Sequence, residues 1–214
     1  MRDLQSAYHG NLHGSGPLYS DYIAYISRRE ATQSLGYWTS LLGDVSPCYF
    51  PNLSTTTTHE LKKIIRVVPR ADALRGFCRA NGTSIANLFQ LAWALVLRAF
   101  TESDNVCFGY LTSGRDVPID RIEDTLGPFI NLLVCHVDFE TNRSVGDILE
   151  TIKESYIDSL PHQQCSLADI QHELGVSNKG LFNTGLSLQR TPSVIDSQNK
   201  IQFEGVVAHD PSEV

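Results

Sequence analysis

The chain has 214 residues, of which 42% are hydrophobic and 19% charged, so it can bury the core of one domain or of one lobe of a larger protein. Its 17 Lys and Arg against 24 Asp and Glu leave a formal charge of −7. The basic residues are scattered apart from Arg28-Arg29 and Lys62-Lys63, which argues against nucleic acid as a partner. The apolar stretches are too short to span a bilayer and the first residues lack the apolar core of a signal peptide, so we expect a cytoplasmic protein without a membrane partner.

The cysteines and histidines form no recognisable metal or catalytic motif. The five cysteines are widely spaced and odd in number, which predicts buried, reduced thiols rather than disulfides or a zinc site. None of the seven histidines lies in a His-Glu-x-x-His spacing, and the sequence has no Gly-x-Ser-x-Gly nucleophile elbow. We interpret His136, inside an apolar run, as a hydrogen-bonded structural residue, and His162, after Pro161, as an exposed loop residue.

Two helices stand out in the first half of the chain. Apolar residues at helical spacing run through residues 22–42, with Ser20 or Asp21 as the expected N-cap and Gly43 as the stop. The clearest helix opens near Ser84, and its apolar stripe predicts the face that turns to the core. That stripe consists of Ile85, Leu88, Phe89, Ala92, Trp93, Val96, Leu97 and Phe100.

Between these two helices the sequence predicts a strand and a further helix. Residues 63–68 form an apolar run that predicts a strand ended by Pro69, and a helix from about residue 71 to 80 follows, with Leu74 and Phe77 turned inward.

Two apolar runs, within residues 106–115 and 126–137, have the length of strands and no polar face, which predicts strands buried on both sides. Arg115 at the mouth of the first run and Asn131 inside the second are costly to bury without partners. Arg115 either forms a fork to a carboxylate that holds two segments together or binds a phosphate or carboxylate of a ligand. Asn131 either hydrogen-bonds across the strands or lines a channel, and Ser113 is interpreted as a turn residue rather than a nucleophile.

The last third of the chain predicts a helix capped by Ser144, a short helix over residues 166–174 stopped by Gly175, and late strands at 182–188 and 201–207. Helices and strands alternate without a strict βαβ rhythm. The predicted fold class is therefore α/β, with a mixed sheet covered by helices.

Several short segments, taken in chain order, resemble the motifs of one family. They are Tyr19–Tyr25, Tyr37–Leu42, Gly82–Leu97, Ser113–Arg115, Gly127–Asn131, His162-Gln163 and Leu181–Thr184. Each is short, but their order and spacing together resemble the C-terminal half of a condensation domain of fungal-type nonribosomal peptide synthetases. The resemblance covers nearly the whole chain.

The resemblance implies a chloramphenicol-acetyltransferase-like fold, in which two lobes face each other across a tunnel. Residues 1–214 would be the C-terminal lobe only, truncated at both ends. In the family, peptidyl or aminoacyl carrier proteins bring a thioester donor and an amine acceptor on phosphopantetheine arms, and an amide forms. These carriers and the N-terminal lobe are the expected partners; no cofactor or metal bound directly to the chain is expected.

The resemblance also implies which residues matter. Ser113 and Asn131 would face the tunnel, and Arg115 would lie at the lobe interface, paired with the Asp of the family's His-His-x-x-x-Asp-Gly motif. That motif does not occur in this sequence, so we expect the isolated chain to be inactive. Two alternatives stay open: a non-catalytic module that binds a carrier or the other lobe, and an epimerising, cyclising or ester-forming relative of the same fold.

Overall fold

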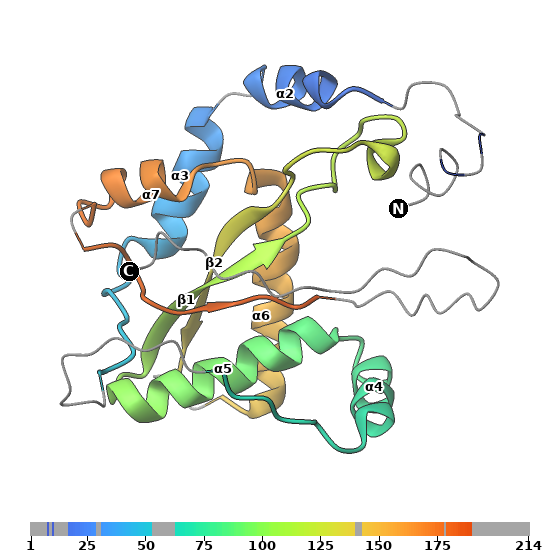
Figure 1. Cartoon of the computed structure of the whole chain (residues 1–214). Helices are drawn as coiled ribbons and strands as arrows, with labels where there is room; N and C mark the ends of the chain where they lie inside the picture. Colours follow the sequence, from blue (N-terminus) through green and yellow to red (C-terminus); the bar gives the residue numbers. More distant parts are fainter. Residues whose placement is uncertain are drawn as a thin grey trace. The chain divides into compact units, whose positions relative to one another are not determined.

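A small mixed sheet, with helices packed around it, organises the described part of the chain (Figure 1). The structure is a computed structural model, and it describes residues 8, 10, 17–28, 31–52, 63–139, 143–177 and 179–189. Every element discussed below lies within residues 17–188. The predicted strand at 201–207 and the segment before residue 8 lie outside the described residues.

The sheet has the order β2-β1-β3. β1 (Asn105–Thr112) pairs antiparallel with β2 (Asn131–Asp138) along its whole length, and parallel with β3 (Gly185–Leu186). Both long strands were predicted, and β1 is buried almost throughout. The third strand is much shorter than the predicted run at 182–188.

Gly109, in the middle of β1, allows another side chain to approach the backbone closely. A Cβ at this position would lie 2.7 Å from the ring of Phe182, which belongs to the segment that leads into β3. The Gly109 amide also donates to the carbonyl of Thr184 at 3.1 Å. A residue without a side chain is therefore what lets the late segment lie directly on the central strand.

The helices that contact the sheet are capped as the sequence predicts. α5 (Ile85–Thr101) packs on β1, α6 (Val145–Ser159) packs on β2, and the two helices also contact each other. Ser84 and Ser144 each accept from the N3 amide of their helix, and the N3 side chain bonds back to the cap in both cases. Such capping boxes satisfy amides that would otherwise lack an acceptor.

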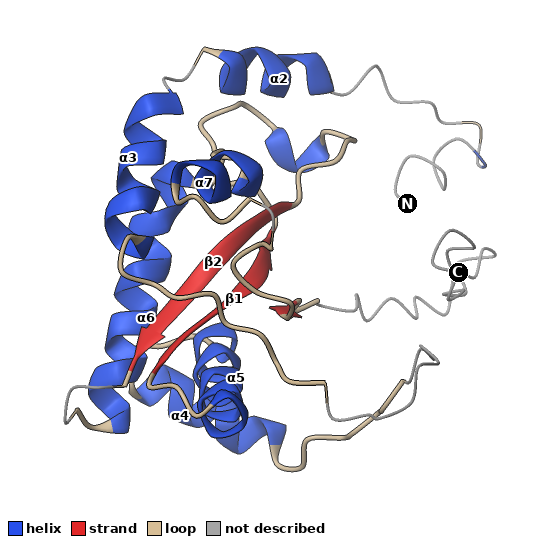
Figure 2. Cartoon of the chain, turned by 90° about the vertical axis from the view of Figure 1, so that its left-hand side faces the viewer, coloured by secondary structure: helices blue, strands red, loops and turns tan. Residues whose placement is uncertain are grey.

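The remaining helices surround this centre (Figure 2). The hydrophobic core joins α3, α5, α6 and β1 through residues such as Trp38, Leu97 and Phe108, all of them fully buried. The other elements are α2 (Tyr19–Ser27), α3 (Ala31–Leu42), α4 (Ala71–Ala80), α7 (Leu167–Glu173) and the 3-10 turns η1 (Ile122–Asp124) and η2 (Leu160–His162).

The predicted single helix through residues 22–42 is wrong. The chain forms two helices, α2 and α3, and the N-cap of α2 is Leu18, which makes no side-chain cap bond. Ser20 and Asp21 lie inside the first turn, where an acidic side chain still favours the helix dipole. Gly43 follows the last residue of α3, as predicted.

The predicted strand at residues 63–68 is also wrong. The segment is in neither a strand nor a helix, and each of its residues is exposed. An apolar run becomes a strand only where another strand supplies the hydrogen-bond partners, and no described strand pairs with this one.

Two helices turn a different face to the core from the one predicted. In α4 the buried side chain is Cys78, whereas Phe77 is 47% exposed. In α5 the buried face holds Leu91, Ala94 and Leu97 together with two polar residues, and most of the predicted stripe lies at partly or fully exposed positions. Because α5 is apolar on nearly all sides, the hydrophobic pattern could not distinguish its faces.

Hydrogen bonds explain how the polar residues on the buried face of α5 can lie in the core. Asn87 Nδ2 donates to Gln90 Oε1 at 3.0 Å, and Asn87 also serves the capping box of Ser84. Amides that bond to one another can enter a core at little cost.

Candidate functional site

The residues singled out in the sequence meet at one end of the sheet, where β1 ends and β2 begins. The strand register places Thr112 opposite Asn131, and the loop from Ser113 leads away from this point. Figure 1 shows this end of the sheet close to α2 and to the turn after α6. We refer to Tyr22, Thr112, Ser113, Arg115, Asn131, Gln163 and Gln164 together as the motif corner.

Arg115 closes the loop between the two strands. Its guanidinium donates to the carbonyl oxygens of Ile122 and Thr125, and it lies 4.0 Å from the ring centre of Phe129. Among the described residues its partners are carbonyl oxygens and an aromatic face rather than a carboxylate. The pairing with the Asp of the motif that this sequence lacks stays a prediction. Arg115 therefore holds the loop in shape.

Phe129 is the centre of a small aromatic cluster under this loop. The rings of Tyr19 and Tyr22 lie 5.2 Å and 4.7 Å from it, both in edge-to-face geometry. Tyr19 also donates its hydroxyl to the carbonyl of Pro128 at 2.9 Å. The cluster joins α2 to the strand loop and covers the guanidinium of Arg115 from one side.

Ser113 is a turn residue, as interpreted from the sequence. Its side chain is exposed and its Oγ accepts from the Arg115 amide at 3.4 Å. The next residue, Gly114, has a φ of 62°, and a Cβ there would lie 1.9 Å from the carbonyl oxygen of Phe129. Only glycine fits this turn.

The amide side chains of Asn131 and Gln164 both lie beside the Tyr22 hydroxyl. Tyr22 donates its hydroxyl to Gln164 Oε1 at 2.9 Å. Asn131 faces the same hydroxyl, but its Nδ2 makes no hydrogen bond of acceptable geometry, and Gln164 Nε2 has no partner either among the described residues. Burial raises the pKa of Tyr22, against the opposing effect of these amides. The corner thus holds two buried donors that lack an acceptor, which is costly without a ligand or water.

The turn after α6 is fastened to the rest of the corner. Gln163 is 2% exposed, and its Oε1 accepts from Thr112 Oγ1 at 3.4 Å. His162 is not the exposed loop residue that we predicted: its ring stacks on Tyr37 at 4.3 Å, and its Nδ1 lies 3.2 Å from Ser34 Oγ. The turn is therefore attached to α3 through His162 and to β1 through Gln163.

Sequence reasoning missed the polar residues beneath this turn. The Tyr110 hydroxyl lies 3.1 Å from Ser159 Oγ. The Ser159 hydroxyl in turn donates to the carbonyl of Tyr156. The sequence signal was weak, because a tyrosine in a strand and a serine at a helix end are common in any core.

The motif corner can bind and position, but it holds no proton-transfer base. Its side chains are amides, hydroxyls and one guanidinium, and no described histidine or carboxylate bonds to Ser113, Asn131 or Gln164. Such groups hydrogen-bond to carbonyl or hydroxyl oxygens of a ligand. The buried thiols offer no alternative nucleophile, since burial raises the pKa of Cys107 to about 12.

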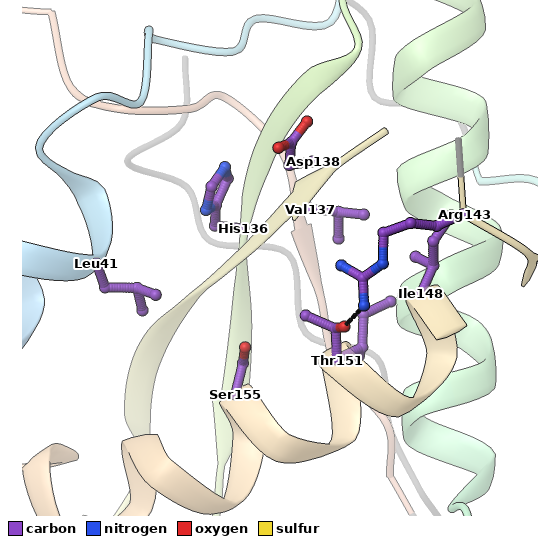
Figure 3. A pocket seen from close by; sticks show the side chains of 9 residues that line it. Leu41, His136, Val137, Asp138, Arg143, Ile148, Thr151 and Ser155 are labelled. Carbon is purple, nitrogen blue, oxygen red and sulfur yellow. Dashed lines mark hydrogen bonds between the residues drawn. The ribbon is translucent and has the colours of Figure 1, made fainter. Parts of the chain in front are cut away.

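His136 lies elsewhere, beside a small cavity between β2 and α6 (Figure 3). Its Nε2 is 3.0 Å from Asn105 Oδ1, in keeping with the structural role inferred for it. Burial lowers the pKa of His136, and the nearby Asp138 opposes this effect. The cavity, of about 120 Å³, is also lined by Arg143, which bonds to Thr151, and none of the lining residues belongs to the motif corner.

The described residues contain no group of three or more His, Cys, Asp or Glu able to hold a metal ion. No single helix among them has the length and apolarity needed to cross a membrane; α4 and α5 meet that criterion only as a pair, bent by 103° at their junction.

A sequence model of the condensation domain matches residues 1–210. The chain belongs to the condensation-domain family. This condensation-domain chain is 52% identical over 220 residues to nonribosomal peptide synthetase 5 of Gibberella zeae, and 42% identical over 217 residues to nonribosomal peptide synthetase nlsA of Emericella nidulans. Both alignments include 100% of this chain but only 2% and 4% of those relatives. The chain thus spans a small fraction of the length of the relatives it matches.

Solved condensation-domain structures share the fold. The first condensation domain of the CDA synthetase superposes with a TM-score of 0.65 at 21% identity, and the EpoB cyclization-docking bidomain from Sorangium cellulosum with 0.66 at 19% identity. The matches cover 87% and 82% of this chain but only 43% and 39% of those chains. The predicted α/β, chloramphenicol-acetyltransferase-like fold class is confirmed.

Proposed function

We propose that residues 1–214 form part of the C-terminal lobe of a condensation domain that makes an amide bond in nonribosomal peptide synthesis. One observation carries this proposal: the chain matches the family in two ways. The family's sequence model matches residues 1–210, and the chain aligns with less than half of a solved condensation domain. In the proposed reaction the acceptor amine attacks the donor thioester. The C–N bond forms, the C–S bond breaks, and the carrier thiol leaves with the proton.

The chain by itself is proposed to be inactive. Condensation needs a group that handles the proton of the attacking amine, and the family's paired histidines do not occur in this sequence. The motif corner supplies hydrogen-bond donors without a base. A separate N-terminal lobe carrying the histidine motif is therefore the proposed partner that completes the site.

Within that complete site, the motif corner is proposed to form one wall of the tunnel. Asn131 Nδ2 and Gln164 Nε2 are buried donors without acceptors, which supports a role in holding an oxygen atom of the substrate or of its arm. Arg115 is bound to the carbonyls of its own loop, so its proposed place at the lobe interface is as a support for that loop. The proposed partners are carrier proteins that bring phosphopantetheine arms, in the cytoplasm.

A reconstitution experiment tests the proposal. The purified chain is incubated with a donor-loaded and an acceptor-loaded carrier domain, alone and with a separately expressed N-terminal lobe, and the carriers are analysed by intact-protein mass spectrometry. We expect the amide on the acceptor carrier only when both lobes are present. Amide formed by the chain alone would contradict the division of labour between the lobes.

The Asn131→Ala variant refines this test. In the reconstituted pair it should lower turnover about tenfold or more, since removal of a single hydrogen-bond donor aimed at developing charge has effects of this size or larger. Unchanged turnover would make Asn131 a packing residue. If both lobes bind but no amide forms, the non-catalytic module becomes the better description.

A further inference from the structure

One surface of the chain has a charge opposite to that of the rest. Residues 63–80 contain five basic residues, Lys63, Arg66, Arg70, Arg75 and Arg79, and a single acidic residue, Asp72. We call residues 63–80 the basic segment; it carries +4, while the remainder of the chain carries −11. The basic residues looked scattered in the sequence because they are spaced three to five positions apart.

The basic segment is open to solvent. All of residues 63–73 are exposed, and so are Arg75 and Arg79. Figure 1 shows α4, which forms the second half of the segment, at the N-terminal end of α5 and away from the strands. α4 contacts α5, and only Cys78 of its residues is buried. The charges therefore face outward rather than into the fold.

Most of these charges are not neutralised by the described part of the chain. Arg75 pairs with Asp72 at 2.8 Å. Arg66 donates only to the carbonyl of its neighbour Ile65, and Lys63, Arg70 and Arg79 form no ion pair with another described residue. The positive potential of the segment thus remains available to a partner.

Large apolar side chains lie among the charges. Ile64, Ile65, Val67 and Phe77 are 75%, 70%, 88% and 47% exposed. A surface that combines apolar side chains with one sign of charge is typical of a protein docking site, where apolar burial contributes affinity and charge contributes orientation.

We infer that the basic segment is the docking surface for a carrier domain, a deduction that rests on the proposed function. The phosphodiester that tethers a phosphopantetheine arm places a negative charge at the point where the carrier must face the condensation domain. The basic segment offers cations and apolar contacts for such a partner. A long polyanion fits less well, because the −11 charge on the rest of the chain would repel it beyond the segment.

Binding of a carrier domain by charge variants tests this inference. The probe is a phosphopantetheinylated carrier domain from a fungal peptide synthetase, and binding to the full chain is measured by fluorescence anisotropy at low and high salt. The double variant Arg66→Glu with Arg79→Glu changes two charges that take part in no ion pair with a described residue. We expect about tenfold weaker binding at low salt and a smaller difference at high salt, as for rim charges of an interface.

The matched control reverses two exposed basic residues outside the segment, Arg28→Glu with Lys179→Glu, so that the net charge changes equally. This control should bind the carrier as the unchanged protein does. Equal loss in both variants, or no loss in either, would overturn the inference. Circular dichroism melting of each variant excludes misfolding as the cause.

The same variants separate this inference from the proposed function. If the unchanged chain binds the carrier and both variants bind equally well, the docking surface is wrong while the proposed function stands. If the unchanged chain binds no carrier and the two-lobe reconstitution makes no amide, the proposed function itself fails. Tighter binding of anionic lipid vesicles or duplex DNA than of the carrier, with the same charge dependence, would assign the segment to another partner and overturn the inference.

Discussion

Individual side chains of the motif corner show how a polar site is built into an apolar fold. Gln163 enters the core because it accepts from Thr112, and Tyr22 does so because it donates to Gln164. Asn131 and Gln164 are left with buried nitrogens that have no acceptor among the described residues. Because such groups cost about 1–3 kcal/mol each, they favour an acceptor from outside the described residues, such as a water molecule or a ligand.

Gly114, which lies between Ser113 and Arg115 of the motif corner, should not tolerate a side chain. In Gly114→Ala the new Cβ would meet the Phe129 carbonyl at 1.9 Å, in addition to the strain of a positive φ. The matched control is Gly82→Ala, which has a similar φ of 60° but nothing within 4 Å of the new Cβ. Urea unfolding should give a loss of about 1–2 kcal/mol for the control and a clearly larger loss for Gly114→Ala. Equal losses would show that the loop can move away from the new methyl group.

His136 should make the chain less stable in mild acid. Because burial lowers its pKa in the folded state below the ordinary value of about 6.5, the unfolded chain binds the proton more readily. The contribution is therefore fully present above that ordinary value and is lost as the pH falls through the folded-state pKa. The free energy of unfolding, measured by urea titration between mildly acidic and neutral pH, should decline less in His136→Gln than in the unchanged chain. An identical decline in both would show that other groups cause it.

Among the elements, α5 shows the limit of hydrophobic patterning most clearly. Its buried face includes Leu91 and two amides, while Leu95 and Phe100 are 41% and 47% exposed. A helix with apolar residues all round fits a core in more than one rotation, and its neighbours decide which is used. Here the face with Leu91, Ala94 and Leu97 enters the core that α5 shares with β1 and α6.

Two leucines of α5, one buried and one exposed, test which face of the helix points to the core. Leu91 is 3% exposed and Leu95 is 41% exposed. We expect Leu91→Ala to cost about 2–5 kcal/mol of unfolding free energy, as for a buried leucine, and Leu95→Ala to cost less than about 1 kcal/mol. Thermal or urea unfolding measures both. A larger loss for Leu95→Ala than for Leu91→Ala would contradict this orientation of α5.

At the scale of the whole molecule, the described residues expose several groups of large apolar side chains. Residues 63–68, the outer face of α5 and the loop between the long strands all contribute, the most exposed being Ile64, Ile65, Val67, Leu126 and Ile130. Exposed apolar side chains that gather in patches usually mark a surface covered by a partner. The exposed apolar patches agree with the alignments, in which this chain covers less than half of each of the two solved structures.

The isolated chain should therefore associate with itself as its concentration rises. Size-exclusion chromatography coupled to light scattering should show a mass that increases with loading, and a dye that binds exposed apolar surface should fluoresce strongly. Adding the N-terminal lobe should reduce both effects, because it covers part of the same surface. A constant monomeric mass with weak dye fluorescence would show that the lobe is self-sufficient.

The sequence alone was enough for the local decisions. Serine caps at 84 and 144, glycine stops at 43 and 175, and two uninterrupted apolar runs located α5, α6, α7 and both long strands. These features depend on groups close together in the chain, so they can be read from it directly. The same holds for the motifs that resemble those of the family, which the match over residues 1–210 bears out.

Only the tertiary structure decided what depends on distant partners. It placed the amides of the turn after α6 against α2 and β1, and it gave Arg115 carbonyl partners. It left residues 63–68 without a neighbouring strand in the part of the chain that the structure describes. It also selected which side of an all-apolar α5 faces inward. The physical reason is common to all of these: a hydrogen bond or a buried contact belongs to two segments, and a sequence specifies each segment without stating which other one it will meet.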